Sequence, residues 1–309
     1  MFLGIDTSCY TTSLAVLDNQ GRLLADERKL LPVAAGSRGL RQSEGVFLHL
    51  QHLPQLAEAV AARLGPLQLA AVGVSSRPRP VEGSYMPVFV AGTSFARALA
   101  AACGAPCLQL SHQEGHLLAG MWSAGFAADE FYALHVSGGT TELLAVKAGD
   151  TLQIAQLGGT ADLRAGQFID RTGVALGLPF PAGPHLEALA KTAVQPAPVP
   201  VSVKGSMLSF SGPESHVQRL LAGGRADRAA VARGVEHCIA ESLRRIIRHA
   251  GQKHGTRPVL FVGGVMANHY ICSYLAEHLP ERCIFADTAY AGDNAVGAAY
   301  YARQKVNKK

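Results

Sequence analysis

The stretch Thr11-Thr12-Ser13-Leu14-Ala15-Val16-Leu17 has a counterpart near the middle of the chain, Thr140-Thr141-Glu142-Leu143-Leu144-Ala145-Val146. Each copy follows a short apolar run and a small polar turn, and each is followed by a turn signal and a third apolar run. The pattern predicts strand, polar turn, strand, turn and strand, occurring twice. Two unrelated β-meanders with common turn residues are the alternative, which the repeated Thr-Thr pair disfavours.

The polar turns of the two copies are residues 6–8 and 137–139. If two such halves face each other, both turns line one cleft. Backbone N–H groups and hydroxyls in turns of this kind are suited to phosphate oxygens. The repeat therefore predicts a duplicated α/β protein with a ligand cleft.

Composition limits the class of protein. The 309 residues are enough for one large or two medium domains. Apolar residues make up 48% and charged residues 17% of the chain, which supplies a globular core and argues against disorder. The net charge of +5 permits contact with an anionic partner such as RNA without requiring it.

The cysteines and the N-terminus indicate the compartment. No Cys-x-x-Cys pair occurs, so neither a zinc ribbon nor a redox dithiol is predicted. Asp6 interrupts the N-terminus too early for a signal peptide. No apolar stretch reaches the roughly 18–20 residues that span a bilayer. We expect a reduced, cytoplasmic protein without a membrane segment.

Strands and helices alternate through the rest of the chain. Helices are predicted at about 46–63, 88–102, 229–250 and 267–278, with strands at 69–75, 107–110 and 259–262. Connections are predicted at the polar stretch 31–44, the Gly-rich stretch 158–183 and the Pro-rich stretch 195–200.

His112 and His116 are spaced i, i+4, which places both imidazoles on one face of a helix that Ser111 can cap. Two neutral imidazoles suit zinc or iron, and one carboxylate from elsewhere would complete a site with an open position. Two surface histidines at a helix start are the alternative. A zincin-type peptidase is disfavoured, because Gln113 stands where its general base would follow the first histidine.

Two segments near the C-terminus have the composition of ligand-binding turns. Gly263 and Gly264 precede Asn268 between an apolar run and a helix, so a ligand could approach the backbone there and Asn268 could bind a base or ribose. A tight structural turn explains these residues equally well. Asp293 precedes a helix of small residues, and from the residues alone a helix cap is favoured over a ligand.

In order and spacing these segments resemble the TsaD/Kae family, formerly called glycoproteases, the catalytic subunits of the tRNA N6-threonylcarbamoyladenosine synthase. The resemblance rests on 112–116, 136–141, 210–212, 263–268 and 292–294, and 165–171 with 181–184 are also similar to a family stretch. It covers nearly the whole chain. It implies the duplicated actin/Hsp70/sugar-kinase fold, a ribonuclease H-like architecture with two lobes and a central cleft. We expect a first lobe at 1–105, on which a C-terminal helix at 294–309 packs, and a second lobe at 106–293.

The resemblance implies a role for each matching residue. His112, His116 and Asp293 match the family's ligands for one divalent metal, iron or zinc. Asp170 matches a ribose-binding acid, and Gly183 and Asn268 match adenosine contacts. The family's substrate phosphate loop is matched by His135, Val136, Ser137, Gly138 and Gly139, and Ser137 to Thr140 would hold the phosphate. Thr140, Gly263 and Gly264 complete the implied nucleotide-binding residues.

His135 stands where some members have a tyrosine close to the metal. An imidazole at this position could be an additional ligand. A strand histidine packed in the core is the alternative.

The chain departs from the family at the positions expected to face the acyl acceptor. Tyr10-Thr11 replaces an Asp-Glu pair, and Arg77-Pro78-Arg79-Pro80 replaces a Gly-Pro-Gly loop. Gln167 and Arg171 stand for a Glu and a Lys, and Pro213-Glu214 occupies the place of a Lys. A divergent paralogue is therefore expected.

Three hypotheses follow. The first is a metal- and adenine-nucleotide-dependent transferase of threonylcarbamoyl or carbamoyl groups, with tRNA, a protein of the same pathway or a second copy as candidate partners. The second is a non-catalytic nucleotide-binding regulator or scaffold, which retention of all three metal ligands disfavours. The third is a metallopeptidase, for which a correctly placed base is missing.

Overall fold

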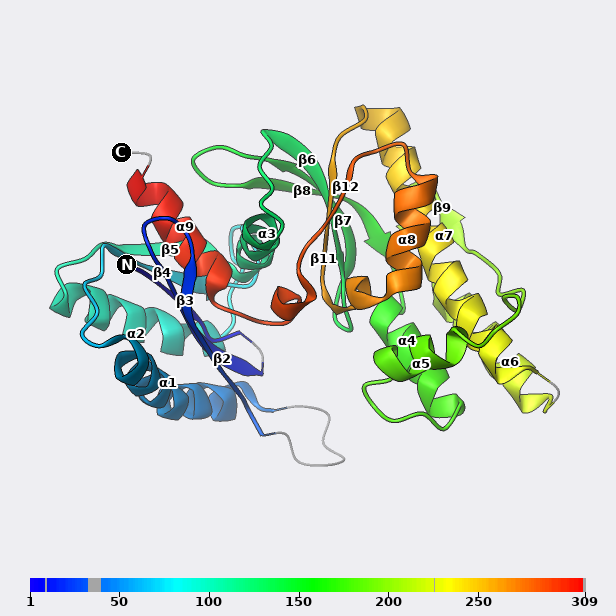
Figure 1. Cartoon of the computed structure of the whole chain (residues 1–309), viewed down its shortest axis with the longest axis horizontal. Coiled ribbons are helices and arrows are strands. Elements are labelled where there is room, and N and C mark those ends of the chain that lie inside the picture. The colour runs from blue at the N-terminus through cyan, green and yellow to red at the C-terminus, as the bar shows by residue number, and fades with distance from the viewer. Residues whose placement is uncertain (9, 33–39, 225, 308–309) are drawn as a thin grey trace. The chain divides into compact units, whose positions relative to one another are not determined.

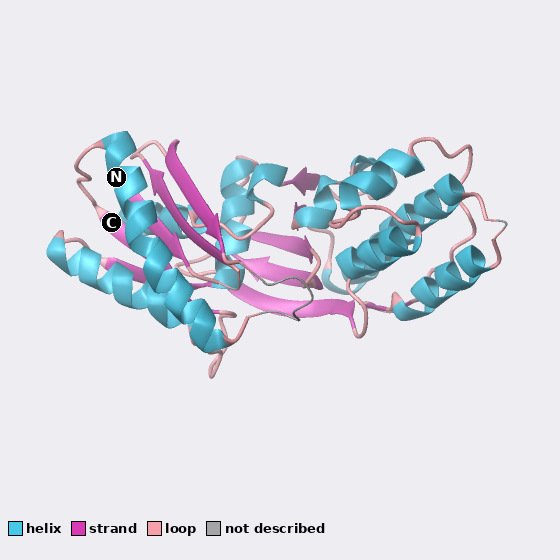
Figure 2. Cartoon of the chain, turned by 90° about the horizontal axis from the view of Figure 1, so that it is seen from below, coloured by secondary structure: helices cyan, strands magenta, loops and turns pink. Residues whose placement is uncertain are grey.

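The computed structural model describes every residue except 9, 33–39, 225 and 308–309, and Figures 1 and 2 show the chain in two views. Cys9 and part of the predicted polar stretch 31–44 therefore lie outside the described residues. The chain divides into two compact units. Unit 1 is Met1–Phe126 with the C-terminal segment that begins at Gly292, and unit 2 is Ala127–Ala291.

Unit 1 is built on a five-stranded sheet in the order β3-β2-β1-β4-β5. The first three strands form an antiparallel meander, and β4 and β5 add to it in parallel. The strands are β1 Phe2–Asp6, β2 Thr11–Leu17, β3 Leu23–Leu30, β4 Ala71–Arg77 and β5 Cys107–Ser111.

Unit 2 repeats this arrangement in a seven-stranded sheet, β12-β11-β6-β7-β8-β10-β9. The order β8-β7-β6-β11-β12 corresponds strand for strand to β3-β2-β1-β4-β5, so the predicted duplication is confirmed. The strands are β6 Glu130–Val136, β7 Thr141–Lys147, β8 Gln153–Thr160, β9 Val203–Lys204, β10 Met207–Leu208, β11 Val259–Val262 and β12 Cys283–Phe285.

Helices cover both faces of the sheet in unit 1 (Figures 1 and 2). Because side chains alternate along a strand, Leu3 and Ile5 of β1 join one cluster, with Leu53 of α1, while Phe2 packs with Ala302 of α9. The helices of this unit are α1 Gln42–Leu64, α2 Val88–Ala102, α3 His112–Ser123 and α9 Val296–Asn307.

The C-terminal helix α9 packs unusually close to the backbone of unit 1. A Cβ atom on Gly73 of β4 would lie 2.0 Å from the carbonyl oxygen of Ala298 in α9. A Cβ on Gly297 of α9 would lie 1.9 Å from the carbonyl oxygen of Gly115 in α3. Only glycine fits at these positions, and the close approach fixes α9 against both the sheet and α3.

The boundary between the units follows Phe126 rather than residue 105. The reason is that β5 pairs with β4 of unit 1 in parallel, beginning with Cys107 opposite Val72, and that α3 packs against α9. The segment 106–126, expected in the second lobe, thus belongs to unit 1.

The core of unit 2 is formed where α7 packs against the sheet, with Val235 and Ile239 of α7 in one cluster with Tyr132 and Leu134 of β6. Its helices are α4 Ala165–Ala175, α5 Gly183–Ala190, α6 Ser211–Ala222, α7 Arg228–His254 and α8 His269–His278, with 3-10 turns η1 Gly264–Ala267 and η2 Thr288–Tyr290. In the described part of the chain, each helix is too short or too polar to cross a membrane.

The Gly-rich stretch 158–183, predicted as a connection, contains the helix α4. Glycines are required in this helix where it packs closely on neighbouring segments, and they interrupt the apolar periodicity by which a helix is predicted. A Cβ on Gly166 would lie 2.7 Å from the backbone nitrogen of Gly138, and one on Gly173 would lie 2.1 Å from the Cβ of Ala182.

Candidate functional site

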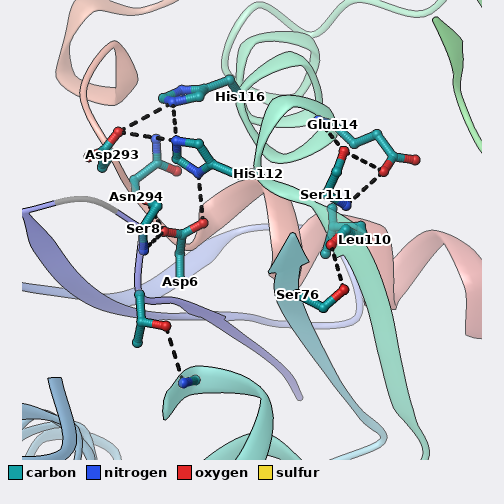
Figure 3. Close-up of polar contacts among 12 residues, drawn as sticks. Asp6, Ser8, Ser76, Leu110, Ser111, His112, Glu114, His116, Asp293 and Asn294 are labelled. Carbon is teal, nitrogen blue, oxygen red and sulfur yellow. Dashed lines mark hydrogen bonds and ion pairs between the residues drawn. The ribbon is translucent and has the colours of Figure 1, made fainter. Parts of the chain in front are cut away.

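The two histidines of the predicted metal site project from the first turns of α3 toward the same point (Figure 3). Their Nε2 atoms are 3.0 Å apart. Ser111 caps the helix as predicted: its Oγ accepts from the N–H of Glu114, and its own N–H donates to the Glu114 carboxylate. The cap fixes the start of α3 and with it the direction of both imidazoles.

Asp293 completes the cluster from the segment that leads into α9. Its Oδ1 lies 3.4 Å from Nε2 of His112 and 3.4 Å from Nε2 of His116. The helix cap, which the residues alone favoured for Asp293, is supplied by its neighbour instead, since Asn294 Oδ1 accepts from the N–H of Val296. The Asp293 carboxylate is thus directed at the two histidines.

Asp6 holds the first histidine from behind. This residue ends β1 and is buried, and its Oδ2 lies 2.9 Å from Nδ1 of His112. Its Oδ1 accepts from the backbone N–H of Ser8. A carboxylate that accepts Nδ1–H leaves the lone pair of a neutral imidazole on Nε2, which is the arrangement found around histidine metal ligands.

The donor set fits one divalent metal ion. Among the described residues, His112, His116 and Asp293 are the His, Cys, Asp or Glu residues whose ligand atoms converge within 4.8 Å. Ligands at about 2.0–2.2 Å from a tetrahedral ion are roughly 3.3 Å apart, close to the distances between these three atoms. Two imidazoles and one carboxylate suit zinc or iron.

The electrostatics of the cluster also favour a cation. Burial opposes a charged imidazolium, but Asp6 and Asp293 outweigh burial and raise the pKa of His112 to about 10. Burial likewise opposes the Asp293 carboxylate, but the hydrogen bonds from His112 and His116 lower the pKa of Asp293 far below its ordinary range. Two ionised carboxylates therefore compensate whatever positive charge lies between the histidines.

Glu114, the acid nearest in sequence to the histidine pair, is not available as a catalytic base. Its side chain is 3% exposed, and its Oε2 accepts from both the N–H and the Oγ of Ser111. Figure 3 shows this carboxylate on the side of α3 away from Asp293. Glu114 therefore does not supply the general base that a metallopeptidase would need.

Ser137, the first residue of the polar turn between β6 and β7 in unit 2, holds the turn together through hydrogen bonds. Ser137 Oγ accepts from the N–H groups of Gly139 and Thr140, and Ser137 N–H donates to the carbonyl of Thr140. Gly138 and Gly139 are exposed, and a Cβ on either would meet nothing within 4 Å. The loop is thus held in shape by its own N–H groups, and its backbone is exposed at Gly138 and Gly139.

Helix α4 begins directly against this loop. The N–H of Ala165 donates to Thr141 Oγ1, and that of Gly166 donates to the carbonyl of Ser137. The positive end of the α4 dipole therefore adjoins the loop, which favours a bound anion.

A cavity of about 540 Å³ lies beside the loop, within unit 2. Its volume is in the range of ordinary ligand sites. Five predicted site residues line it: Gly138, Asp170, Gly183, Gly264 and Asn268. Its other lining residues are Gly166, Ile169, Pro181, Pro184, Glu187, Val265, Ala267, His269 and Thr288.

The remaining predicted residues of this unit lie behind the cavity or beside it. His135 and Val136 are buried in β6, and Gly263 packs on them, since a Cβ there would lie 2.3 Å from the Val136 carbonyl oxygen. His135 belongs to unit 2, so its role as an additional metal ligand stays a prediction.

Asp170 and Asn268 are positioned by bonds within unit 2. Asp170 Oδ1 accepts from the N–H of Ala182. Asn268 Oδ1 caps α8 by accepting from the N–H of Ile271, and its Nδ2 donates to Glu236 Oε1 at 2.6 Å. Asn268 is therefore both a structural cap and part of the cavity wall.

Three residues of these sites were missed from the sequence: Asp6, Glu187 and Glu236. Glu187 lines the cavity and accepts from the N–H of His269. Glu236 is fully buried beneath Asn268, and burial raises its pKa to about 7 against the opposing hydrogen bond from Asn268. Asp6 could have been found as a polar residue at the end of a buried strand. For the two glutamates the sequence offers no signal beyond their helical spacing.

Gln167, one of the departures from the family pattern, has a local role. Gln167 Oε1 accepts from the N–H of Arg164 at the start of α4, a bond that the family's glutamate could also make. Tyr10, another departure, is 43% exposed beside the first meander turn, and nothing in the described residues explains it.

Comparison with known proteins gives the same assignment over most of the chain. Residues 47–300 match the family model TsaD, tRNA N6-adenosine threonylcarbamoyltransferase. A protein of this name from Dichelobacter nodosus is 32% identical over 97% of this chain and 90% of its own length. One from Thermus thermophilus is 32% identical over 92% of this chain and 88% of its own length.

Solved structures agree on the fold. Component A of (R)-2-hydroxyglutaryl-CoA dehydratase from Acidaminococcus fermentans has a TM-score of 0.59 at 17% identity, over 99% of this chain and 98% of its own. The ROK hexokinase from Thermus thermophilus has a TM-score of 0.53 at 17% identity, over 100% and 99%. The predicted fold class is thereby confirmed, and the chain belongs to the tRNA N6-adenosine threonylcarbamoyltransferase family.

Proposed function

We propose that this chain is a metal-dependent threonylcarbamoyl transferase that takes the group from an adenylate. The observation that carries the proposal is the convergence of His112, His116 and Asp293 at 3.0–3.4 Å, with Asp6 behind His112. A chain that served only as a scaffold would not need three ligands and a supporting carboxylate in this geometry. The curated relatives named above are transferases that act on tRNA adenosine.

In unit 1, His112, His116 and Asp293 would hold one zinc or iron ion. The chemistry that such an ion supplies is Lewis-acid polarisation of the threonylcarbamoyl carbonyl. Asp6 keeps His112 in the tautomer that presents Nε2, and the capping box of α3 keeps both rings in place. Three protein ligands leave at least one position for the substrate.

In unit 2, the cavity beside the loop 137–140 would bind the adenylate. The loop backbone and the start of α4 would hold the phosphate. Asp170 would accept from the ribose hydroxyls, and Asn268 and Gly183 would lie against the nucleoside. One solved fold neighbour, the activator of 2-hydroxyisocaproyl-CoA dehydratase from Clostridium difficile, has ADPNP bound, which supports a nucleotide ligand for this fold.

The acceptor side differs from the family. Tyr10 and Thr11 replace two acids, and positive charge is added by Arg77 at the end of β4 and by Arg79 on the loop after it. A less negative site should tolerate a more anionic acceptor and should be poorer at the family's reaction at adenosine N6. Transfer to tRNA by this chain alone is therefore expected to be weak, even with the metal and nucleotide sites intact.

The metal site is tested by substitution of a ligand and of its support. His112→Ala should abolish stoichiometric zinc or iron binding, because one imidazole is lost. Asp6→Asn should weaken the affinity by about 10- to 100-fold, as loss of an outer-shell carboxylate does. His254→Ala, at an exposed position outside the cluster, is the control. Elemental analysis and chelator competition measure both effects, and wild-type protein without metal after loading would refute the site.

The nucleotide site is tested at Asp170. Asp170→Asn keeps an acceptor for the N–H of Ala182 but removes the charge, so ADP binding should weaken by about 1.5–3 kcal/mol. Asp150→Asn, at an exposed turn of the same unit, should leave the affinity unchanged. Calorimetry with ATP, ADP and AMP provides the measurement. Absence of heat for all three nucleotides with the wild type, metal present, would contradict the assignment.

The acceptor is tested in a reconstituted transfer assay with unmodified tRNA. The Thermus thermophilus relative provides the reference rate. The wild-type chain should be slow, and the double variant Tyr10→Asp, Thr11→Glu should be faster, because it restores the two acids. Wild-type rates equal to the reference would show that Thr11, Gln167 and nearby backbone substitute for the lost acids.

A further inference from the structure

Most of the net charge of the chain is concentrated in one short segment. Residues 241–257 contain five lysines and arginines and one glutamate, which accounts for +4 of the total of +5. This segment is the C-terminal half of α7 and the turn that follows it. The rest of the chain is therefore close to neutral.

Of the three arginines that follow one another in the segment, Arg245 and Arg248 are exposed and Arg244 is half-buried. Arg244 and Arg245 both donate to Glu241, at 2.6–2.8 Å, so two guanidiniums share one carboxylate. The hydrogen bond from Arg244, against burial, contributes most to lowering the pKa of Glu241 to about 2. Arg248 is exposed and has no ion-pair partner among the described residues.

The helix dipole does not account for these arginines. Cations favour the C-terminal end of a helix through its dipole, but the effect is confined to the last turn. In α7 that turn already holds Lys253 and His254. Arg244, Arg245 and Arg248 come one and a half to three turns earlier. Glu241 neutralises one of their three positive charges, which leaves two for a partner.

An aromatic pair on α8 adjoins the arginines. The rings of Tyr274 and His278 stack with centroids 4.1 Å apart and an interplanar angle of 15°. Tyr274 donates its hydroxyl to Glu241, the same carboxylate that holds Arg244 and Arg245. Figure 1 shows α7 and α8 side by side in unit 2.

The ring of His278 is held in place, with one face stacked on Tyr274, although the residue is exposed. Its Nδ1 donates to the carbonyl of Tyr274 at 2.9 Å, which holds the ring on the tyrosine. An exposed, immobilised ring is a platform on which an unpaired base can stack. Of the neighbouring acids, Glu241 is already paired and Glu281 is buried against Gly251 of α7, while Glu277 on α8 is exposed.

We infer that Arg244, Arg245 and Arg248 of α7, with Tyr274 and His278 of α8, form a docking surface for RNA. Guanidiniums match phosphate oxygens in pairs, and the stacked rings offer a face to a base, whereas an acidic protein would use only the charge. The inference rests on the proposed function in one respect, which is the choice of tRNA as the RNA.

Binding of a fluorescently labelled, unmodified tRNA transcript to the full chain, followed by anisotropy between 50 and 200 mM salt, tests the surface. Neither metal nor nucleotide is needed, so failure of the transferase proposal would not affect the result. Arg248→Gln should weaken binding several-fold and reduce the slope of log Kd against log salt by about one. His278→Ala should weaken binding at least about fivefold without changing the slope.

Arg219→Gln on α6 is the matched control, because Arg219 is exposed in the same unit and its loss changes the net charge equally. It should leave the affinity unchanged. Equal weakening by Arg219→Gln and Arg248→Gln would show diffuse attraction and overturn the inference. So would an absence of tRNA binding at 50 mM salt, or binding of polyglutamate in place of tRNA through the same arginines, which would indicate a protein partner.

Discussion

The close packing of α9 on the sheet and α3 of unit 1 is the constraint on which the proposed metal site depends. The ligands come from two places far apart in sequence, the start of α3 and the residue before α9. They meet because α9 lies in backbone contact with α3 at Gly115 and Gly297. Gly115 lies between the two histidines, so this contact is made within the turn that carries them. A larger residue at either position would separate Asp293 from the imidazoles.

The same principle orders unit 2, with a different result. There Gly166 brings the start of α4 onto the loop between β6 and β7, and Gly263 brings the end of β11 onto Val136. The effect is to gather backbone N–H groups and a helix dipole rather than metal ligands. The two copies of one topology thus use close backbone contacts for two purposes, to bring two histidines and Asp293 together in unit 1 and to place a helix start against the glycine loop in unit 2.

Much of the fold was predictable from the sequence because it depends on local patterns. The repeated meander was visible in the Thr-Thr runs, and the capping box of α3 was indicated by Ser111. Helix α4 was missed because its glycines, required by packing, hide helical periodicity. The domain boundary was misplaced because β5 pairs with β4, a strand distant in sequence, and local sequence patterns do not predict such pairing.

The site was predictable in part. The histidine pair follows from helical spacing, but the role of Asp293 required the family resemblance, since an acid before a helix is more often a cap. Asn294 caps the helix instead, and no sequence rule says which of two adjacent polar residues will be the cap. Asp6 and Glu236 act through His112 and Asn268 across the fold, and contacts of that kind are created only by tertiary structure.

The most direct test of this account is a zinc titration of Gly297→Ala, a variant that keeps all three ligands. Its added methyl group would push α9 away from α3, so the affinity should fall by at least about tenfold in protein whose circular dichroism remains that of the wild type. Gly292→Ala, next to Asp293 but with open space around it, should bind zinc as the wild type does. Unchanged affinity and stoichiometry in Gly297→Ala would contradict the claim that this contact assembles the site.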